Sequence, residues 1–456
     1  MTVKENKLKH VTLDGVRIHL KTDENKLWIN SKYVLFLNDT TTFILESMID
    51  CYYKVSKEKV PEETVKKMLE KYNVTKEQAQ QDFDAIIGII NSFARDEIPD
   101  NMVGTEVITN ENLTAPNRMD ISLTYDCNNE CHHCYLKENK NKDGTLTTEQ
   151  WKEIIDKLWK IGIPQIVFTG GEVFLKKDDI IELAEYSKKF VCGIITNGTL
   201  ITSEIAKELK RVELDWIQIT LESATESIHD EMVGRKGAWK ETVQGIKNCI
   251  NAEVPTSINT TLTKKNCSEL DLSNLIIFCK TLGVEYLSTN AIINSGRGIK
   301  AKKDIGVSEK ELSSILKKAK DQAECFGIGF NWFLPTCYKN LNPMDLGFGQ
   351  RCCSACSVNM MVQPEGSVIP CQSWIHETLG NIITDDWETI WNHPTAKKLR
   401  NYEFNKIISY AEASDGMTQS SLEKTKNECI DCEYENLCHG ACPLDKINSE
   451  SDNNET

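Results

Sequence analysis

Three closely spaced cysteines in the first third of the chain have the residue type and the spacing to hold a metal centre. Cys127, Cys131 and Cys134 form a C-x3-C-x2-C pattern just after an apolar, alternating run at residues 119–125. Thiolates on one loop can occupy three corners of a metal centre and leave the fourth for a group that is not protein. A structural zinc ion usually takes four protein ligands, whereas a 4Fe–4S cluster can keep one iron open. The spacing therefore favours the cluster and leaves zinc as the alternative.

The last third of the chain carries a second concentration of cysteines. Its members are Cys352, Cys353, Cys356, Cys371, Cys429, Cys432, Cys438 and Cys442. The last four follow a C-x2-C-x5-C-x3-C pattern that could form a zinc ribbon-like site. The upstream cysteines need partners as well, so this many thiols in one region suit two metal centres.

The remaining cysteines fall in apolar sequence patterns. They are Cys51, Cys192, Cys249, Cys267, Cys279, Cys325 and Cys337. Free cysteines in such patterns usually behave as small hydrophobic residues, so we expect these seven side chains to be buried and without a metal.

Length and composition limit the class of protein. The chain has 456 residues, a net charge of −15 and 18 cysteines, and this length suits roughly two to four domains. The negative charge argues against a nucleic-acid partner, which requires a basic face. The first residues lack the apolar segment of a secretory signal, and no apolar run approaches the ~18 residues of a membrane span. Many cysteines without an export signal indicate reduced thiols, so we expect a cytoplasmic protein with no membrane partner.

The elements that must position these cysteines alternate between strand and helix. Strands are expected at residues 119–125, 165–169, 191–196, 216–222, 257–263 and 284–292, and helices at residues 148–160, 178–189, 203–211, 238–252 and 268–282. Thr147 and Gln150 have the spacing of a capping box before the first of these helices. Repeated β-α units predict parallel strands with right-handed crossovers, hence an α/β sheet or open barrel. Because the chemistry of such folds lies at the carboxyl ends of the strands, the first three cysteines lie at the expected functional edge.

Three further strand ends carry residues suited to ligand binding. They are Gly170, Gly171 and Glu172 after the second strand, Thr196 and Asn197 after the third, and Thr220 and Glu222 after the fourth. Paired glycines permit close backbone approach or a positive φ, although a simple tight turn has the same pattern. Thr220 and Glu222 point to one face because side chains alternate along a strand. They could hydrogen-bond the hydroxyls of a ribose, or they could form an ordinary surface pair.

Residues 1–95 are predicted to form a small domain of their own. Strands are expected at residues 16–21, 27–29 and 34–37, followed by helices at residues 40–53, 60–72 and 76–93. A β-ribbon followed by three helices is a winged-helix arrangement. The unit has no basic recognition stripe, so DNA binding is not favoured, and a structural cap is another interpretation. The polar residues 96–116 are expected to be a linker.

As a set, the motifs between about residues 115 and 335 resemble those of the radical S-adenosylmethionine (SAM) enzymes. The cysteine loop, Gly-Gly-Glu, Thr-Asn-Gly and a polar pair follow the first four strands in that family's order. The resemblance implies that Cys127, Cys131 and Cys134 hold a 4Fe–4S cluster whose fourth iron is chelated by the amino and carboxylate groups of SAM. It also implies that cleavage of SAM yields a 5′-deoxyadenosyl radical, which takes hydrogen from an unactivated carbon.

The same resemblance implies a set of SAM contacts. The residues are Gly170, Gly171 and Glu172 for the amino group, Thr196 and Asn197 in the third motif, Thr220 and Glu222 for the ribose, and Arg235 for the carboxylate. Two positions depart from the family pattern. Val173 replaces a common proline, and His133 stands where an aromatic residue often precedes the last cysteine, a change that bears on how adenine is contacted.

Residues 352–442 resemble a SPASM domain, the twin-cluster extension of peptide-modifying members. The spacing Cys356-x9-Gly366-x4-Cys371 and the later C-x2-C-x5-C-x3-C run fit its pattern. The resemblance implies two sets of ligands: Cys356, Cys371, Cys442 and one of Cys352 or Cys353 for a first auxiliary cluster, and Cys429, Cys432 and Cys438 for a second.

The second set lacks a ligand, because the family's last cysteine is missing and no cysteine follows Cys442. We expect Asp445 to supply the fourth ligand, with a spare cysteine from the pair Cys352 and Cys353 as the alternative. An oxygen ligand would change the charge and potential of the cluster.

The N-terminal unit resembles a PqqD-like recognition element, which occurs with enzymes that mature ribosomal peptides. The resemblance rests on the ribbon, the Leu37-Asn38 turn, three helices and Asp82 at the start of the last helix. It implies that a leader peptide binds by strand addition at the edge of the ribbon, against the third helix.

We therefore predict an α/β protein in four segments. These are a PqqD-like winged-helix domain at residues 1–95, a linker at residues 96–116, a partial (β/α)6 radical SAM barrel at residues 117–335, and a SPASM domain with two auxiliary iron–sulfur clusters at residues 336–456. The expected cofactors are SAM, the 4Fe–4S cluster at the SAM site and the auxiliary clusters.

The predicted activity is the maturation of a ribosomally made precursor peptide, of the ranthipeptide or sactipeptide type, with its leader. We expect a thioether crosslink from cysteine sulfur to a carbon, with an electron donor such as flavodoxin or ferredoxin. Carbon–carbon crosslinking, epimerisation and sulfatase-type formylglycine formation are alternatives. An iron–sulfur electron carrier or a winged-helix regulator belongs to another class and is disfavoured, because a carrier has no need to chelate SAM.

Overall fold

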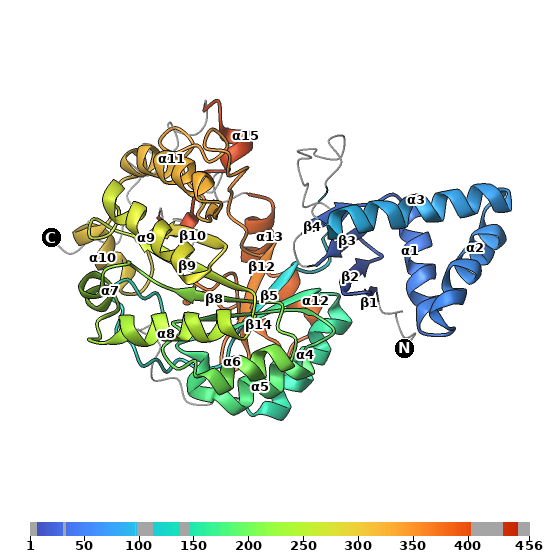
Figure 1. Cartoon of the computed structure of the whole chain (residues 1–456), viewed down its shortest axis with the longest axis horizontal. Coiled ribbons are helices and arrows are strands. Elements are labelled where there is room, and N and C mark those ends of the chain that lie inside the picture. Colours follow the sequence, from blue (N-terminus) through green and yellow to red (C-terminus); the bar gives the residue numbers. More distant parts are fainter. Residues whose placement is uncertain are drawn as a thin grey trace. The chain divides into compact units, whose positions relative to one another are not determined.

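The structure, a computed structural model, describes residues 7–30, 33–95, 97, 113–136, 146–402 and 432–445. The chain divides into two compact units (Figure 1). One contains Met1–Ala115 with Ile155–Pro164 and Lys189–Val191, and the other contains the rest of the chain.

The first unit contains an antiparallel sheet followed by three helices. Its strands, in the order β1-β2-β3-β4, are β1 (Leu8–Leu13), β2 (Val16–Lys21), β3 (Lys26–Ile29) and β4 (Tyr33–Phe36), and its helices are α1 (Asp39–Tyr52), α2 (Val60–Lys71) and α3 (Lys76–Ala94). A short 3-10 turn, Lys57–Lys59, precedes α2. The expected ribbon is therefore a four-stranded sheet, and β1 is the strand that the sequence pattern did not reveal.

Local signals in the sequence explain where these helices begin. The Asn38 side chain accepts a hydrogen bond from Thr41 N at the start of α1, and Thr75 does the same for Gln78 N at the start of α3. Pro61 occupies the first turn of α2, where its missing N–H is not needed. Asp82 lies inside α3, so its predicted place at the helix start was wrong.

The core of the first unit forms where the sheet meets the helices. Side chains that are buried there include Ile18, Leu20, Leu27 and Ile29 from the sheet, and Ile44, Leu45, Met48, Phe83, Ile90 and Phe93 from the helices. The helices therefore cover one face of the sheet and give the unit a hydrophobic core of its own.

The second unit contains a parallel sheet whose main strands follow the chain in sequence order. Its strands are β5 (Arg118–Ser122), β6 (Gln165–Thr169), β7 (Val191–Thr196), β8 (Trp216–Thr220), β9 (Thr256–Leu262), β10 (Tyr286–Ala291) and β11 (Gly329–Trp332). The full order is β11-β10-β9-β8-β7-β6-β5-β12-β13-β14. The predicted parallel α/β architecture is confirmed, and the sequential order is the one expected for an open barrel.

Helices connect these strands. They are α4 (Thr148–Ile161), α5 (Lys177–Tyr186) after a 3-10 turn at Val173–Lys176, α6 (Ser203–Arg211), α7 (Glu226–Val233), α8 (Ala238–Asn251), α9 (Glu269–Leu282), α10 (Gly298–Ile305) and α11 (Glu309–Cys325). The predicted capping box before α4 is confirmed, since Thr147 N donates to Gln150 Oε1 (2.9 Å) and Gln150 N to Thr147 Oγ1 (3.3 Å). The short helices α7 and α10 were not predicted.

The C-terminal region extends the same sheet. Its elements are β12 (Asn359–Val362), β13 (Ser367–Ile369), β14 (Gly380–Asn381), α12 (Trp387–Trp391), α13 (Pro394–Arg400) and α15 (Glu435–Cys438). Strand β12 runs parallel to β5, and β13 and β14 follow it in antiparallel order. Over the described ranges, no helix has the length and apolar character to cross a membrane.

Candidate functional site

The Gly-Gly pair after β6 packs its backbone against the segment that leads into the first cysteine loop. Gly171 N donates to Thr124 O (2.7 Å), and Glu172 N donates to Asp126 O (2.8 Å). A Cβ at Gly171 would lie 2.0 Å from Asp126 O, and Gly170 has a φ of +142°. Both positions therefore require glycine, because two stretches of backbone meet there.

Glu172 joins the ends of β6 and β7. Its fully buried carboxylate accepts hydrogen bonds from Thr196 Oγ1 (2.7 Å), Asn197 N (2.8 Å) and Phe174 N (3.1 Å). Burial raises the pKa of Glu172, and these donors oppose that rise. The carboxylate thus connects the ends of β6 and β7, and the contact of the Gly-Gly-Glu motif with the amino group of SAM stays a prediction.

Asn197 brings the end of β7 to the first cysteine. Its side-chain amide donates to Asn128 Oδ1 (2.8 Å) and lies 3.9 Å from Cys127 Sγ. The Asn128 amide donates in turn to Thr199 Oγ1 (2.8 Å). The Gly-Gly-Glu motif therefore contacts the segment of the cysteine loop through its backbone, and the Thr-Asn-Gly motif contacts the loop through the Asn197 amide.

The other side of the cysteine loop is held by the ends of α7 and β10. Glu130 N donates to Val233 O (2.8 Å), and His132 N donates to Met232 O (3.0 Å). From the segment after β10, Arg297 N donates to Cys134 O (3.0 Å).

The Arg297 guanidinium adds two contacts to the same loop. It donates to Cys131 O and to Glu130 Oε2 (3.2 Å). Arg297 was not among the residues predicted from the sequence, although its neighbours are glycines and a Cβ at Gly296 would lie 2.6 Å from Tyr135 O. The sequence signal that could have identified Arg297 is the run Gly296-Arg297-Gly298, which lies just after the last predicted strand.

The three thiols of the loop lie close enough to affect one another's charge. Loss of solvation raises the pKa of Cys131 well above its ordinary value, and negative charge on Cys134, Glu222 and Cys127 adds to the rise. A bound iron reverses this balance, because a coordinating thiol is deprotonated. Three sulfur donors at the carboxyl edge of the sheet therefore fit an iron–sulfur cluster.

A single metal ion fits less well. Across the parts of the chain that are described, no three His, Cys, Asp or Glu side chains are grouped so as to hold one ion. In a 4Fe–4S cluster each thiolate binds its own iron, so such a tight group is not required.

Glu222 faces the cysteine loop. Its carboxylate is fully buried, with Oε2 accepting from Thr261 N (2.7 Å). Its other oxygen lies 3.0 Å from His133 Nε2, within ion-pair range but without hydrogen-bond geometry. His133, which precedes the last cysteine of the loop, thus lies within ion-pair range of a carboxylate that follows β8.

Arg235 also lies at the cysteine loop. Its Nε donates to Asn129 Oδ1 (2.7 Å), and its Nη2 donates to Glu241 Oε2 (2.6 Å). The structure therefore brings Arg235 to the loop, while its expected contact with the SAM carboxylate stays a prediction.

A row of polar side chains crosses three strands beside this loop. Thr220 on β8 is aligned with Asn259 on β9, which is aligned with Ser288 on β10. Among the described residues, Asn259 Oδ1, Ser288 Oγ and Asn290 Oδ1 are buried without a hydrogen-bond partner.

The residues that precede this row face the opposite way. Ile219, Ile258 and Leu287 are fully buried, as expected for the helix-covered face of the sheet. Buried polar atoms usually find a partner, so the row suits a polar ligand. Thr220 is the one member of this row that was predicted from the sequence, although polar residues that interrupt apolar strands were a visible signal.

We call Cys353, Cys356, Cys371 and Cys442 the inner set of C-terminal cysteines, and Cys429, Cys432 and Cys438 the outer set. Burial raises the pKa of Cys353, and negative charge on the other three members adds to the rise. Burial also raises the pKa of Cys371 to about 11 and that of Cys442 to about 12. Cys353 is therefore the member of the adjacent pair that lies with the inner set.

The described members of the outer set are Cys432 and Cys438. Cys429 lies outside the described residues. Asp445, expected to complete this set, pairs with Lys302 Nζ (2.5 Å) and raises the pKa of Cys442. Asp445 therefore lies beside Cys442 of the inner set, and its role as a ligand of the outer cluster stays a prediction.

The scattered cysteines follow the prediction in part. Cys51, Cys192, Cys249, Cys267 and Cys279 are buried. Cys325 is exposed at the end of α11, and Cys337 is half-buried. For Cys325 the prediction of a buried side chain was wrong.

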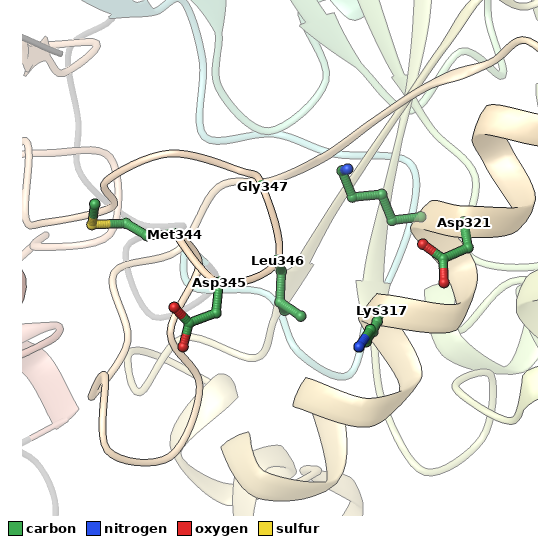
Figure 2. Close-up of a pocket in the computed structure, with 7 residues that line it drawn as sticks. Lys317, Asp321, Met344, Asp345, Leu346 and Gly347 are labelled. Carbon is green, nitrogen blue, oxygen red and sulfur yellow. The ribbon is translucent and has the colours of Figure 1, made fainter.

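A pocket of about 290 Å³ lies between α11 and the segment at residues 344–347. Figure 2 shows Lys317 and Asp321 on the helix, with Asp345 and Leu346 on the facing segment. Its lining contains no cysteine and none of the predicted site residues, so this pocket is not the candidate site.

Two stretches of the chain match known families. Residues 121–270 match the radical SAM superfamily, and residues 352–433 match the iron–sulfur cluster-binding domain named SPASM. The radical SAM domain binds SAM and a 4Fe–4S cluster, and the SPASM domain binds auxiliary iron–sulfur clusters. The cofactor predictions are therefore confirmed at the level of the domains.

Among curated proteins, two relatives are similar to this chain to the same degree. The antilisterial bacteriocin subtilosin biosynthesis protein AlbA of Bacillus subtilis (strain 168) is 28% identical, over 73% of this chain and 68% of AlbA. The AdoMet-dependent heme synthase of Methanosarcina barkeri is also 28% identical, over 72% of this chain and 91% of the synthase.

Solved structures extend the likeness to nearly the whole fold. Streptococcus suis SuiB bound to precursor peptide SuiA aligns with a TM-score of 0.65 at 15% identity, covering 96% of this chain and 96% of SuiB. Native anSMEcpe with bound AdoMet aligns with a TM-score of 0.54 at 18% identity, covering 73% of this chain and 90% of the other.

Proposed function

We propose that this chain, a radical SAM enzyme with a SPASM domain, modifies a ribosomally made precursor peptide and forms a thioether from cysteine sulfur to a carbon. Sequence similarity alone does not choose the substrate, since a bacteriocin biosynthesis protein and a heme synthase are equally similar. The N-terminal unit is the feature that favours a peptide.

The exposed edge of the N-terminal sheet carries this proposal. Strand β4 pairs with β3 on one side, and its Val34 and Phe36 side chains are 44% and 45% exposed. An extended peptide can add to such an edge by main-chain hydrogen bonds, with pockets for alternate side chains. The Tyr33 ring packs against Phe93 of α3, with 5.1 Å between the ring centroids, so the third helix lies beside this edge.

The opposite edge is less suited to a peptide. At β1, Tyr53 Oη donates to His10 O (2.8 Å) and Tyr52 Oη donates to Thr12 O (3.2 Å). These hydroxyls occupy carbonyls that an added strand would need. We therefore assign the leader to β4, in keeping with the PqqD-like role inferred from the sequence.

The chemistry belongs to the second unit. SAM at a reduced 4Fe–4S cluster supplies a carbon-centred radical that removes hydrogen from an unactivated carbon. Cys127, Cys131 and Cys134 would hold that cluster at the carboxyl edge of the sheet, and the polar row from Thr220 to Ser288 would bind polar groups beside it. A low-potential donor such as flavodoxin or ferredoxin would supply the electron.

The inner set of C-terminal cysteines lies near this centre. Tyr135, which follows the last cysteine of the loop, interacts with the charges of both Cys134 and Cys371, and its hydroxyl donates to Gln372 Oε1 (3.2 Å). An auxiliary cluster in this position can accept the electron that is released when a carbon radical joins a sulfur. This supports thioether formation over epimerisation, which leaves no electron to remove.

A peptide assay tests the activity. The reduced enzyme is incubated with leader-bearing, cysteine-containing peptides encoded beside its gene, and mass spectrometry measures the product. We expect loss of two hydrogens per crosslink, and a fragment spectrum that joins cysteine to another residue. An unchanged mass with an inverted residue would assign epimerisation, and formylglycine at a cysteine position would assign the sulfatase-type activity.

Substitutions at the sheet edge test the role of the N-terminal unit. Val34→Glu with Phe36→Glu should weaken binding of the leader-bearing peptide at least tenfold and leave SAM cleavage without peptide unchanged. Leu270→Glu on α9 is the matched control, because Leu270 is 69% exposed and lies in the other unit. Equal peptide turnover by the edge variant and the control would show that β4 is not the binding edge.

A further inference from the structure

We propose that Cys352 is a thiolate ligand of the outer auxiliary cluster. The proposal deepens the cofactor assignment of the SPASM domain, and it is independent of which substrate the enzyme modifies. Two adjacent cysteines, Cys352 and Cys353, then serve two different metal centres.

The Cys352 thiol lies against the segment that carries the outer set. Its Sγ is 3.3 Å from Tyr402 Oη, and the Tyr402 ring stacks on His439 with 3.9 Å between centroids and 7° between planes. His439 directly follows Cys438 in the chain. Two contacts and one peptide bond therefore lead from Cys352 to Cys438, the last residue of the outer set.

The backbone around Cys352 is fixed in the same place by its neighbours. Gln350 Nε2 donates to Leu437 O (2.7 Å), which joins residue 350 to α15. The Arg351 guanidinium donates to Trp332 O (2.8 Å) and to Asn331 Oδ1 (2.8 Å), which anchors the segment to β11. The position of Cys352 thus follows from hydrogen bonds on both sides of it.

Tyr338 links the same two segments. Arg351 N donates to the Tyr338 hydroxyl (2.8 Å), and the Tyr338 ring lies near that of Tyr434, with 6.2 Å between the ring centroids. Tyr434 lies between Cys432 and Cys438 in the chain.

The other candidate for the missing ligand is Asp445. Its carboxylate pairs with Lys302 and interacts with Cys442 of the inner set. To bind the outer cluster it would have to leave a lysine partner. The partner of the Cys352 thiol is a neutral hydroxyl, which can donate a hydrogen bond to a thiolate that binds iron, and thiolate is the usual ligand of these clusters.

Removing cysteines in pairs tests the assignment. A cluster that loses two of its four thiolates should bind its iron far more weakly, whereas two clusters that each lose one thiolate should keep most of their iron. All variants are made in a Cys127→Ala, Cys131→Ala, Cys134→Ala background, so that only auxiliary iron remains. The four double variants are C352A/C438A, C352A/C371A, C353A/C371A and C353A/C438A. Iron and sulfide are measured after anaerobic reconstitution, with Mössbauer spectra of the bound iron.

The assignment predicts a crossed pattern. C352A/C438A and C353A/C371A should each lose about half of the auxiliary iron, whereas C352A/C371A and C353A/C438A should retain most of it with altered spectra. Circular dichroism checks that all four are folded, and each variant controls the others because all lack two cysteines. The reverse pattern, or equal loss in all four, overturns the proposal. Peptide turnover is not part of the readout, so failure here is distinct from failure of the proposed function.

Discussion

The cysteine loop after β5 is held by backbone contacts from three neighbouring parts of the same unit, namely the end of β6, the end of α7 and the segment after β10. The outer set of C-terminal cysteines is gathered differently. Cys438 is the last residue of the short helix α15, and side-chain contacts connect this helix and the residue after it to the Cys352 segment, namely Gln350 with Leu437 and Cys352 with Tyr402, whose ring stacks on His439.

This difference separates a site that the fold prepares from a site that the metal helps to form. Backbone hydrogen bonds between packed strand ends exist whether or not iron is present. Where few such bonds connect the ligands, the binding free energy of the metal becomes part of the folding free energy. We therefore expect the loop after β5 to keep its fold when its cysteine ligands are removed. The region around the outer set should instead lose order when its iron is removed.

The largest effect should come from the prepared site. Replacing Cys127, Cys131 and Cys134 together with Ala should abolish SAM cleavage, because the cluster that reduces SAM loses every protein ligand. Auxiliary iron and the far-UV circular dichroism spectrum should remain, since the loop is held by its backbone. The measurement is 5′-deoxyadenosine by liquid chromatography with mass spectrometry. Undiminished 5′-deoxyadenosine would falsify the assignment of the loop to the SAM cluster.

Removal of all iron should affect the second region most. After anaerobic chelation, amide hydrogen exchange at residues 432–445 should accelerate at least tenfold, because their ordering depends on the metal. Strands β5 to β10 should exchange at nearly the same rate as before. Hydrogen exchange followed by mass spectrometry checks both regions in one sample. Uniform acceleration across the chain would show that the metal stabilises both regions alike.

Adding one methyl group at Gly171 tests how tightly the backbone is packed around the cysteine loop after β5. Gly171→Ala should destabilise the protein by at least about 2 kcal/mol and lower SAM cleavage at least tenfold, because the new Cβ meets Asp126 O. The measurements are thermal unfolding and 5′-deoxyadenosine yield.

Gly88→Ala is the matched control for this change. Gly88 lies within α3 with nothing near its would-be Cβ, so alanine there should raise stability by about 0.5–1 kcal/mol and leave SAM cleavage unchanged. Similar losses in both variants would show that the Gly171 effect is not local to the site.

The smallest effect is expected at Asp445. Because Asp445 pairs with a half-exposed Lys302, Asp445→Ala should change stability by less than about 1 kcal/mol. The Mössbauer spectrum of the outer cluster should be unchanged, in contrast to that of Cys352→Ala. A clear change in the outer cluster of the Asp445 variant would restore the carboxylate ligand inferred from the sequence.

The sequence predicted the parallel sheet because its strands are apolar runs at regular intervals, and the order of its motifs because each directly follows a strand. It could not predict β1, whose Leu8–Leu13 segment mixes Lys9 and His10 with apolar residues. Edge strands of this kind are stabilised by their neighbours, here β2 and the tyrosines Tyr52 and Tyr53 at the end of α1, more than by their own composition.

Sequence spacing was also unable to assign individual ligands. Cys352 and Cys353 are equivalent in any spacing argument, and their different surroundings depend on contacts with residues about 50 to 90 positions later. Glu172 and Arg297 show the same limit. The motif around Glu172 was recognised, but its bonds to Thr196 and Asn197 depend on how two strand ends meet, and Arg297 belongs to no predicted motif.

The separation of the inner-set cysteines along the chain has a consequence for how the enzyme is made. A cluster that joins Cys356 to Cys442 closes a long loop, and the entropy of closing a loop grows only slowly with its length. Since Cys438 and Cys442 are synthesised after the strands of the sheet, those strands can fold on the ribosome before either auxiliary site has all its thiols. Iron insertion at these sites would then be a late step, and its rate would limit how quickly newly made chains become active.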